Sequence, residues 1–388
     1  MIPYGKQQIT QQDIDAVVET LQSDYLTQGP KVSEFEQALA QYTQAQYCCV
    51  TNSATSALHI ACLALGINNE SIVWTTPNTY VASANCALYC GATIDFVDID
   101  PTSYNISPIS LKDKLKACKE SNSPLPNVVI PVHFSGLPCD MEEIHELSLE
   151  YGFSIIEDAS HAIGSHYNNK KMGNCYYSDI TIFSFHPVKI MTCGEGGAAL
   201  TNSATLFEQL KLLSSHGVTR DPKLTIKQNK PPWYYEQIDL GFNYRMTDIQ
   251  ATLGLSQLKR LNSALYKRKE IAQQYDEYLA ALPIKLPTHV PNRQSSWHLY
   301  TIQIDGINYN RDIIFNHLRK LGIGVNVHYI PVHTQPFYQN LGFNWGDFPN
   351  AEHYFHQIIS LPIYPDLTHE QQLQVVNALK ESLEKGKK

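Results

Sequence analysis

Lys189 is the residue whose sequence surroundings point most directly to chemistry. It lies five positions after Ser184, and the glycine-rich run 194–197 follows it closely. A lysine amine forms a Schiff base with an aldehyde, and it serves in this way when its surroundings lower the ammonium pKa. The pattern indicates a site for an aldehyde cofactor, while a solvated surface lysine is the plain alternative.

Two further positions offer what an anionic, ring-shaped cofactor needs. The run 52–56 precedes a predicted helix, where free N–H groups and the helix dipole favour an anion. An ordinary N-cap explains the same residues equally well. Asp158 follows a predicted strand, and a carboxylate there can keep a pyridinium nitrogen protonated. A helix-capping role is the alternative for Asp158.

The other candidates are weaker when each is taken alone. Tyr80 lies beyond a strand end, where its ring can stack on a flat cofactor or pack in the core. Arg245 opens a helix, and its guanidinium suits phosphate, carboxylate or an exposed ion pair. His161 is also explained as a structural histidine, and the run 328–331 as a turn. The order of these signals along the chain carries the interpretation.

Composition predicts a globular enzyme. The 388 residues are 43% hydrophobic and 17% charged, which suits one large domain with a smaller one. The net charge of -8, without a Lys/Arg block, argues against nucleic acid or an anionic membrane as a partner. Since no apolar stretch reaches transmembrane length and the start resembles no signal peptide, we expect a cytoplasmic protein. The nine cysteines lack zinc-ligand spacing, so we expect reduced thiols and no metal.

Strand-like and helical runs alternate from about residue 45 to residue 201. Helical spacing predicts helices at 53–65, 81–89 and 141–151. Strands are predicted at 48–51, 72–75, 93–97, 128–132, 154–157, 180–184 and 198–201. Such alternation predicts a mostly parallel sheet covered on both faces. Ligands bind beyond the carboxyl ends of such strands, where most of the candidate residues fall.

The second half of the chain changes character. Residues 221–237 are polar and carry Pro231-Pro232, which predicts a long loop. The helical pattern at 247–258 is expected to lead into a second domain, with a helix at 311–321 and strands at 299–304 and 325–329. We therefore expect a large domain over 1–258, including the N-terminal segment, and a small domain over 259–388.

Taken together, these stretches resemble the DegT/DnrJ/EryC1/StrS sugar aminotransferases, pyridoxal-phosphate enzymes of fold type I. The similarity covers nearly the whole chain, in the family's order, at 26–29, 52–58, 77–85, 131–136, 157–164, 183–197, 241–257 and 328–331. The runs 52–58 and 160–165 are most similar to members of pseudaminic acid biosynthesis. The resemblance implies an α/β fold with a mostly parallel seven-stranded sheet in a large domain and a smaller α+β C-terminal domain.

The resemblance also implies how the cofactor, pyridoxal 5'-phosphate, is held. Lys189 resembles the Schiff-base lysine and proton carrier, and Asp158 the partner of the ring nitrogen. The remaining cofactor contacts implied are Ala54, Thr55 and Ser184 at the phosphate, Tyr80 stacked on the ring and His161 near its phenolic oxygen.

Substrate contacts and assembly are implied in the same way. Arg245, His328 and Tyr329 would lie near the substrate. Asn243 resembles a phosphate contact donated by the neighbouring subunit, which implies a homodimer with shared active sites.

The implied reaction is transamination of C4 of a UDP-linked 4-keto-6-deoxy-N-acetylhexosamine, with L-glutamate as amino donor. It gives a UDP-4-amino-4,6-dideoxy sugar for pseudaminic acid biosynthesis. Related dehydratases carry histidine in place of the lysine, so Lys189 favours transamination. Amination of another nucleotide-linked 4-keto or 3-keto deoxysugar is the alternative. A regulatory or scaffold protein is a third hypothesis, which no basic face or helix-turn-helix pattern supports.

Overall fold

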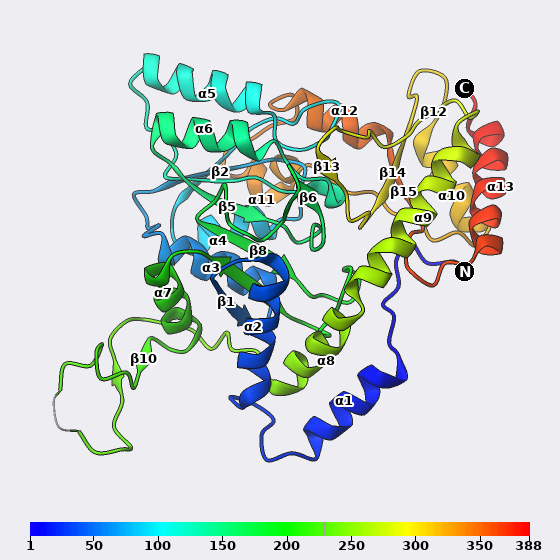
Figure 1. Ribbon diagram of the computed structural model, residues 1–388. Coiled ribbons are helices and arrows are strands. Elements are labelled where there is room, and N and C mark those ends of the chain that lie inside the picture. The colour runs from blue at the N-terminus through cyan, green and yellow to red at the C-terminus, as the bar shows by residue number, and fades with distance from the viewer. Residues whose placement is uncertain (228–229) are drawn as a thin grey trace.

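A seven-stranded sheet forms the centre of the protein, as seen in a computed structural model that describes residues 1–227 and 230–388 (Figure 1). The strand order is β1-β9-β8-β5-β4-β2-β3, and β9 alone runs antiparallel to its neighbours. The strands are β1 (Tyr47–Thr51), β2 (Ile72–Thr75), β3 (Thr93–Phe96), β4 (Val128–Ile130), β5 (Ser154–Asp158), β8 (Ile180–Ser184) and β9 (Gly197–Thr201). All seven predicted strands are thereby confirmed, as is the mostly parallel sheet.

Helices cover both faces of this sheet because successive strand residues point to opposite sides. Val50 and Ile155 pack in one apolar cluster, whereas their neighbours Cys49 and Ile156 pack in another. The first cluster includes residues of α2 (Pro30–Thr43), α5 (Pro108–Glu120) and α6 (Met141–Tyr151). The second includes residues of α3 (Ala54–Ala64), α4 (Ala82–Tyr89) and α7 (Ala204–Ser214). Burial on both faces explains why the strands read as nearly continuous apolar runs.

The C-terminal part has a core of its own. Its sheet has the order β12-β14-β15, comprising β12 (Ile284–Lys285), β14 (Tyr300–Ile304) and β15 (Ile358–Leu361). Helices α9 (Leu261–Leu279), α10 (Arg311–Lys320) and α13 (His369–Gly386) pack on it. Ile2 belongs to this core as well, so the chain start lies against the C-terminal part. The division at residue 258 stays a prediction.

One predicted strand is wrong. Residues 325–329 form no strand, and Asn326 makes only a single bridge to Ser360 on β15. The side chains that follow, Val327, His328 and Tyr329, line a cavity, which takes this segment away from a ladder.

Two helices near the chain start brace α8 (Asp248–Lys259). In α1 (Gln11–Leu21), Asp13 accepts from Ser256 at 2.6 Å and pairs with Arg260 at 2.7 Å. The Asp248 carboxylate accepts from the backbone N–H groups that open α2, including that of Gly29 at 2.7 Å. These contacts hold the chain where it passes from the large sheet towards the C-terminal core.

An arm projects from the main body between β10 (Val218–Thr219) and β11 (Glu236–Gln237), as Figure 1 shows. It corresponds to the predicted loop, whose residues 228–229 lie outside the described residues. The remaining strands form a small sheet, β6 (His166–Tyr167), β7 (Lys170–Lys171) and β13 (Arg293–Gln294), and the short helices are α11 (Pro336–Gln339) and α12 (Pro349–Gln357). Within the described residues, no helix is long and apolar enough to span a membrane.

Candidate active site

A cavity of about 550 Å³ brings together most of the predicted site residues. It opens where β5 and β8 end, beside the start of α3. The predicted residues that line it are Ala54, Thr55, Tyr80, Asp158, His161, Ser184, Lys189, His328 and Tyr329. Their spacing along 276 positions of chain shows that the sheet, and not local sequence, assembles the site.

Lys189 lies on the loop between β8 and β9. The loop closes on itself, because Phe185 N–H donates to Gly196 O at 2.9 Å and Cys193 N–H donates to Phe185 O at 2.9 Å. Burial lowers the pKa of the Lys189 ammonium to about 8, against the opposing attraction of Asp158. A larger fraction of this amine is therefore neutral near pH 8 than of an ordinary lysine, and only the neutral amine is nucleophilic or basic.

Asp158 is held at the carboxyl end of β5 by two donors. Ser83 Oγ, from the first turn of α4, donates to Asp158 Oδ2 at 2.6 Å, and Ser160 N–H donates to Oδ1 at 3.0 Å. Thr79 Oγ1 lies 2.8 Å from Ser83 Oγ and extends the chain of hydroxyls. A buried carboxylate held in this way keeps one orientation towards the cavity.

The start of α3 forms the anion-binding side of the cavity. Ser53 caps the helix by accepting from Ser56 N–H, while the N–H groups of Ala54 and Thr55 belong to the first turn, which lacks intrahelical acceptors. Gly197 lies so close that a Cβ there would be 2.5 Å from Ala54 N. Glycine at this position lets β9 approach the helix start, beside which Ser184 also faces the cavity.

His161 is neutral and its tautomer is set by its neighbours. Its Nδ1 accepts from Ser135 N–H at 3.3 Å, so the proton is on Nε2, which lies 3.1 Å from the Tyr329 hydroxyl. Burial lowers the pKa of His161 well below its usual value, with the charge of Lys189 adding to the effect. Burial also raises the Tyr329 pKa, so this pair stays uncharged.

Two other buried histidines surround the lysine without carrying charge. Burial lowers the pKa of His328 to about 3, and His328 Nδ1 lies 2.7 Å from Ser360 Oγ. Burial likewise lowers the pKa of His298, whose ring centroid lies 4.3 Å from that of His161. Asp158 is therefore the charged group that acts on Lys189 among the ionisable residues lining the cavity.

Asn243 and Arg245 do not line this cavity. They lie beside the segment that leads into α3, where Asn52 Nδ2 donates to Asn243 O at 3.4 Å and Arg245 bridges Thr51. Arg245 Nη1 donates to Ser215 Oγ at 3.1 Å. Neither side chain is brought to the other predicted residues within this chain, so the predicted roles of both stay predictions.

Sequence reasoning missed several cavity residues, chiefly Tyr4, Ser83, His298 and Asn326. Ser83 had a signal, since it is a hydroxyl inside the small, apolar helix 82–89. Tyr4 had none, because it reaches the cavity only through the pairing of the chain start with residues 322–324.

The sheet, the lysine loop and the buried aspartate define a pyridoxal-phosphate aminotransferase of fold type I, and comparison with known proteins agrees. The profile of the DegT/DnrJ/EryC1/StrS aminotransferase family matches residues 7–380. The chain belongs to the DegT/DnrJ/EryC1/StrS aminotransferase family.

Relatives and solved structures extend this comparison. The UDP-4-amino-4,6-dideoxy-N-acetyl-beta-L-altrosamine transaminase of Campylobacter jejuni strain 81-176 is 41% identical, over 100% of this chain and 99% of that protein. Helicobacter pylori PseC, an aminotransferase of pseudoaminic acid biosynthesis, superposes with a TM-score of 0.90 at 32% identity, covering 99% of each chain. The pyridoxal-phosphate form of the putative sugar aminotransferase Spr1654 from Streptococcus pneumoniae superposes with a TM-score of 0.89 at 31% identity, covering 99% of each chain.

The residues present fit pyridoxal phosphate. The cavity offers an amine of lowered pKa for the aldehyde, a fixed carboxylate for the ring nitrogen and a helix start for the phosphate. Its volume suits a small cofactor together with part of a substrate. Among the residues that the structure describes, no group of three potential ligands could hold a metal ion.

Proposed function

We propose that this enzyme aminates C4 of a UDP-linked 4-keto-6-deoxy-N-acetylhexosamine, with L-glutamate as the amino donor. The observation that carries the chemistry is Lys189, an amine with its pKa lowered to about 8, in one cavity with Asp158. The sugar follows from the relatives, since the Campylobacter jejuni transaminase is 41% identical over the whole chain. The product then serves pseudaminic acid biosynthesis.

Lys189 is the catalytic residue in this proposal. Pyridoxal phosphate, when bound, supplies the aldehyde that exchanges the amino group and the ring that spreads negative charge. Neutral Lys189 takes the proton from Cα of glutamate and, in the second half-reaction, returns it to C4 of the sugar. One amine serves both transfers because Lys189 faces the same cavity in both half-reactions.

The other predicted residues bind and orient. Asp158 keeps the ring nitrogen protonated, and Ala54, Thr55 and Ser184 hold the phosphate. Tyr80, 62% exposed at the cavity mouth, covers the ring. His161 donates through Nε2, so His161 and Tyr329 together present an uncharged polar edge to the ring's phenolic oxygen. His328 contacts the substrate, and Arg245, which does not line this cavity, contacts it from the partner subunit.

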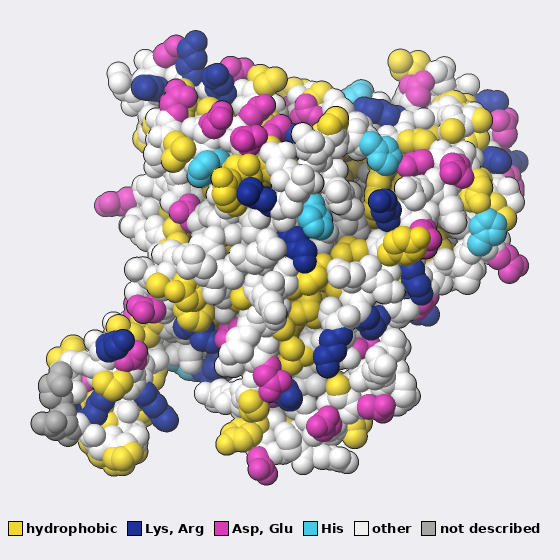
Figure 2. Space-filling view, viewed as in Figure 1, with side chains coloured by type: hydrophobic (Ala, Val, Ile, Leu, Met, Phe, Trp, Pro, Cys, Tyr) yellow, Lys and Arg dark blue, Asp and Glu magenta, His cyan; other side chains and the backbone are white. Residues whose placement is uncertain are grey.

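We further propose a homodimer in which Asn243 reaches the phosphate of the partner's site. The arm between β10 and β11 supports this, because it carries bulky apolar side chains in solvent, as Figure 2 shows at the lower left. Ile226 is 86% exposed and Trp233 is 73% exposed. Exposed apolar surface of this kind marks an interface. The nine free cysteines support a cytoplasmic, reducing location.

A panel of keto sugars tests the substrate. The purified protein with bound cofactor is incubated with glutamate and, in turn, UDP-linked, dTDP-linked and GDP-linked 4-keto-6-deoxy sugars, and products are identified by NMR. We expect fastest turnover of the UDP-linked N-acetylhexosamine, with ring couplings that report the configuration at C4. Preference for a dTDP or GDP sugar would replace the proposed substrate. Absence of any 2-oxoglutarate release would overturn the aminotransferase assignment.

A further inference from the structure

A second cavity, of about 560 Å³, lies on the other side of a thin wall from the active site. The wall is the turn η1 (Phe134–Gly136), where Ser135 lines the second cavity while its N–H donates to His161 of the first. Ser296 Oγ adds a 2.7 Å hydrogen bond to His161 O. Among the described residues, none lines both cavities, and one backbone segment separates them.

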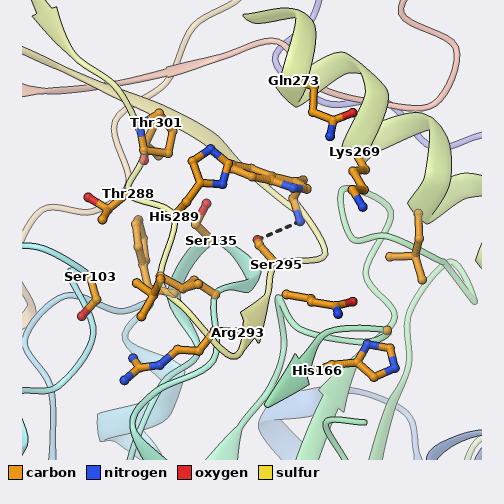
Figure 3. Close-up of a pocket in the computed structure, with 18 of the residues that line it drawn as sticks. Ser103, Ser135, His166, Lys269, Gln273, Thr288, His289, Arg293, Ser295 and Thr301 are labelled. Atoms are coloured by element: carbon orange, nitrogen blue, oxygen red, sulfur yellow. Dashed lines mark hydrogen bonds between the residues drawn. The ribbon is translucent and has the colours of Figure 1, made fainter. Parts of the chain in front are cut away.

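Three elements supply most of the lining of this second cavity, and residues 102–104 and the turn η1 add to it. Helix α9 supplies one side, residues 287–297 the opposite side, and the β6-β7 hairpin the floor. Figure 3 shows Lys269 and Gln273 extending from α9, with Thr288 and Ser103 across the space and His166 below. In Figure 2, basic and histidine side chains surround a hollow in this region of the face.

The lining is rich in cationic groups and has no carboxylate among the described residues. Arg293 is held by Asp140, and His289 Nε2 lies 2.9 Å from Asp276 Oδ2, so those two are already compensated. Lys171 Nζ donates to Tyr42 O at 2.9 Å, which leaves its charge without a counterion in the described part of the chain. Lys269 has neither an ion pair nor a hydrogen bond with another described residue.

Two of these groups lie directly opposite each other. His166 and Lys171 are cross-strand partners in the β6-β7 hairpin, and both face the cavity. Burial, with the charge of Lys171, lowers the pKa of His166. With its pKa lowered, His166 is neutral beside the Lys171 cation, and an anion bound between them is attracted to Lys171 and favours the protonated imidazole.

Between the charges, the lining carries groups that recognise a polar ring. Hydroxyls of Ser103, Thr288 and Thr301 and the amides of Asn262 and Gln273 offer donors and acceptors. Aromatic side chains of Tyr104, Tyr266 and Trp297 offer flat apolar surface. A cavity of this size with apolar walls and a few convergent polar groups is typical of small-molecule sites.

We propose that this second cavity binds a phosphate ester of a polar ring compound, with the phosphate between Lys269 and the His166/Lys171 pair. Nucleotides and sugar phosphates share this chemistry. The ring lies against residues 287–297, where the hydroxyl and aromatic groups gather. This site is independent of the catalytic cavity, so it does not rest on the proposed sugar substrate.

Charge reversal at Lys269 tests the proposal in the intact holoenzyme. Uridine 5'-monophosphate, glucose 6-phosphate, inorganic phosphate and the uncharged uridine and glucose are titrated by calorimetry. We expect Lys269→Glu to weaken binding of the phosphate esters about tenfold or more, as for loss of a charge-assisted hydrogen bond. Lys267→Glu, an exposed lysine on the same helix that does not line the cavity, is the matched control.

Hydrogen–deuterium exchange locates the bound ligand, because the UDP-linked substrate proposed above would also bring a nucleotide to the catalytic cavity. We expect ligand-dependent protection at 262–273 and 287–297, present in the Lys267→Glu control and lost in Lys269→Glu and Gln273→Glu. Which ester binds more tightly decides between nucleotide and sugar phosphate. Protection confined to 53–58, equal weakening by Lys267→Glu and Lys269→Glu, or inorganic phosphate binding as tightly as both esters would overturn the proposal.

Discussion

Ser83 Oγ donates a 2.6 Å hydrogen bond to Asp158 Oδ2, which joins the first turn of α4 to the carboxyl end of β5. Both side chains are buried, so water does not compete for this bond. It fixes the carboxylate that we assign to the cofactor ring, although the two residues lie 75 positions apart in the chain. Ser83 is a positioning residue, because it acts through Asp158.

Removal of this hydroxyl should weaken cofactor binding. Hydrogen bonds to charged groups contribute about 1.5–3 kcal/mol, so we expect Ser83→Ala to raise the dissociation constant of pyridoxal phosphate about tenfold or more. The release of pyridoxal phosphate on serial dilution of the protein, followed by the absorbance of the cofactor, measures this dissociation constant. Ser121→Ala, which removes an exposed hydroxyl at the end of α5, serves as control. Unchanged cofactor affinity in Ser83→Ala would show that Asp158 is positioned without it.

Replacement of Lys189 by another cation separates charge from proton transfer. Lys189→Arg keeps the positive charge, but a guanidinium is not deprotonated in proteins and forms no Schiff base. We expect turnover to fall by about 10²–10⁴ or more, the range for loss of a general acid-base group. Borohydride reduction and mass spectrometry should find no covalent cofactor in this variant. Lys259→Arg, at the end of α8, should behave like the parent protein, and activity retained in Lys189→Arg would remove the catalytic assignment.

The lowered pKa of Lys189 predicts a pH dependence for the cofactor-free protein. Neutral amine attacks the aldehyde, so the rate of pyridoxal phosphate incorporation should rise with pH and level off above about 8, the pKa of this amine. Stopped-flow absorbance between pH 6.5 and 9.5 follows this rate. A rate still rising steeply at pH 9.5 would mean that the lysine titrates near its ordinary value.

The same shift affects stability with a definite sign. Between about pH 8 and the ordinary value of 10.5, the folded apo-protein has released the proton that the unfolded chain still holds. Since the unfolded state binds more protons there, the contribution of Lys189 makes the free energy of unfolding rise with pH across that window. Urea unfolding of the apo-protein and of Lys189→Met at pH 8 and pH 9.5 isolates this contribution, and an identical pH slope in both proteins would contradict it.

Close packing at Gly197 should make this position intolerant of a side chain. A Cβ there would lie 2.5 Å from Ser53 O and Ala54 N, which are backbone atoms at the start of α3. We expect Gly197→Ala to lower the free energy of unfolding by about 1–3 kcal/mol and to weaken phosphate binding. Gly306→Ala meets nothing closer than 4.0 Å and is the matched control. Denaturant titration with and without pyridoxal phosphate measures both effects, and equal stabilities would show that the helix start moves freely.

Much of the central fold was predictable from the sequence. The strands are short apolar runs, and the segments between them carry apolar residues at helical spacing. The structure confirms helices at α3, α4, α6, α8 and α10 and all seven central strands within a few residues. The strand predicted at 325–329 is wrong, because the aromatic side chains of His328 and Tyr329 line a cavity and do not extend a sheet. A single sequence cannot separate those two uses of an aromatic side chain.

The sequence by itself determined the order of chemical groups: helix start, aromatic ring, aspartate, serine and lysine. These groups follow strand ends, and parallel strands present their carboxyl ends at one edge, so local pattern implied a shared site. Only the tertiary structure decided the pKa of Lys189. Burial lowers it, and the residues around the cavity come from distant parts of the chain, from Tyr4 to His328. The tertiary structure also decided which serine holds Asp158 and created the second cavity beside α9, since both depend on contacts between segments far apart in sequence.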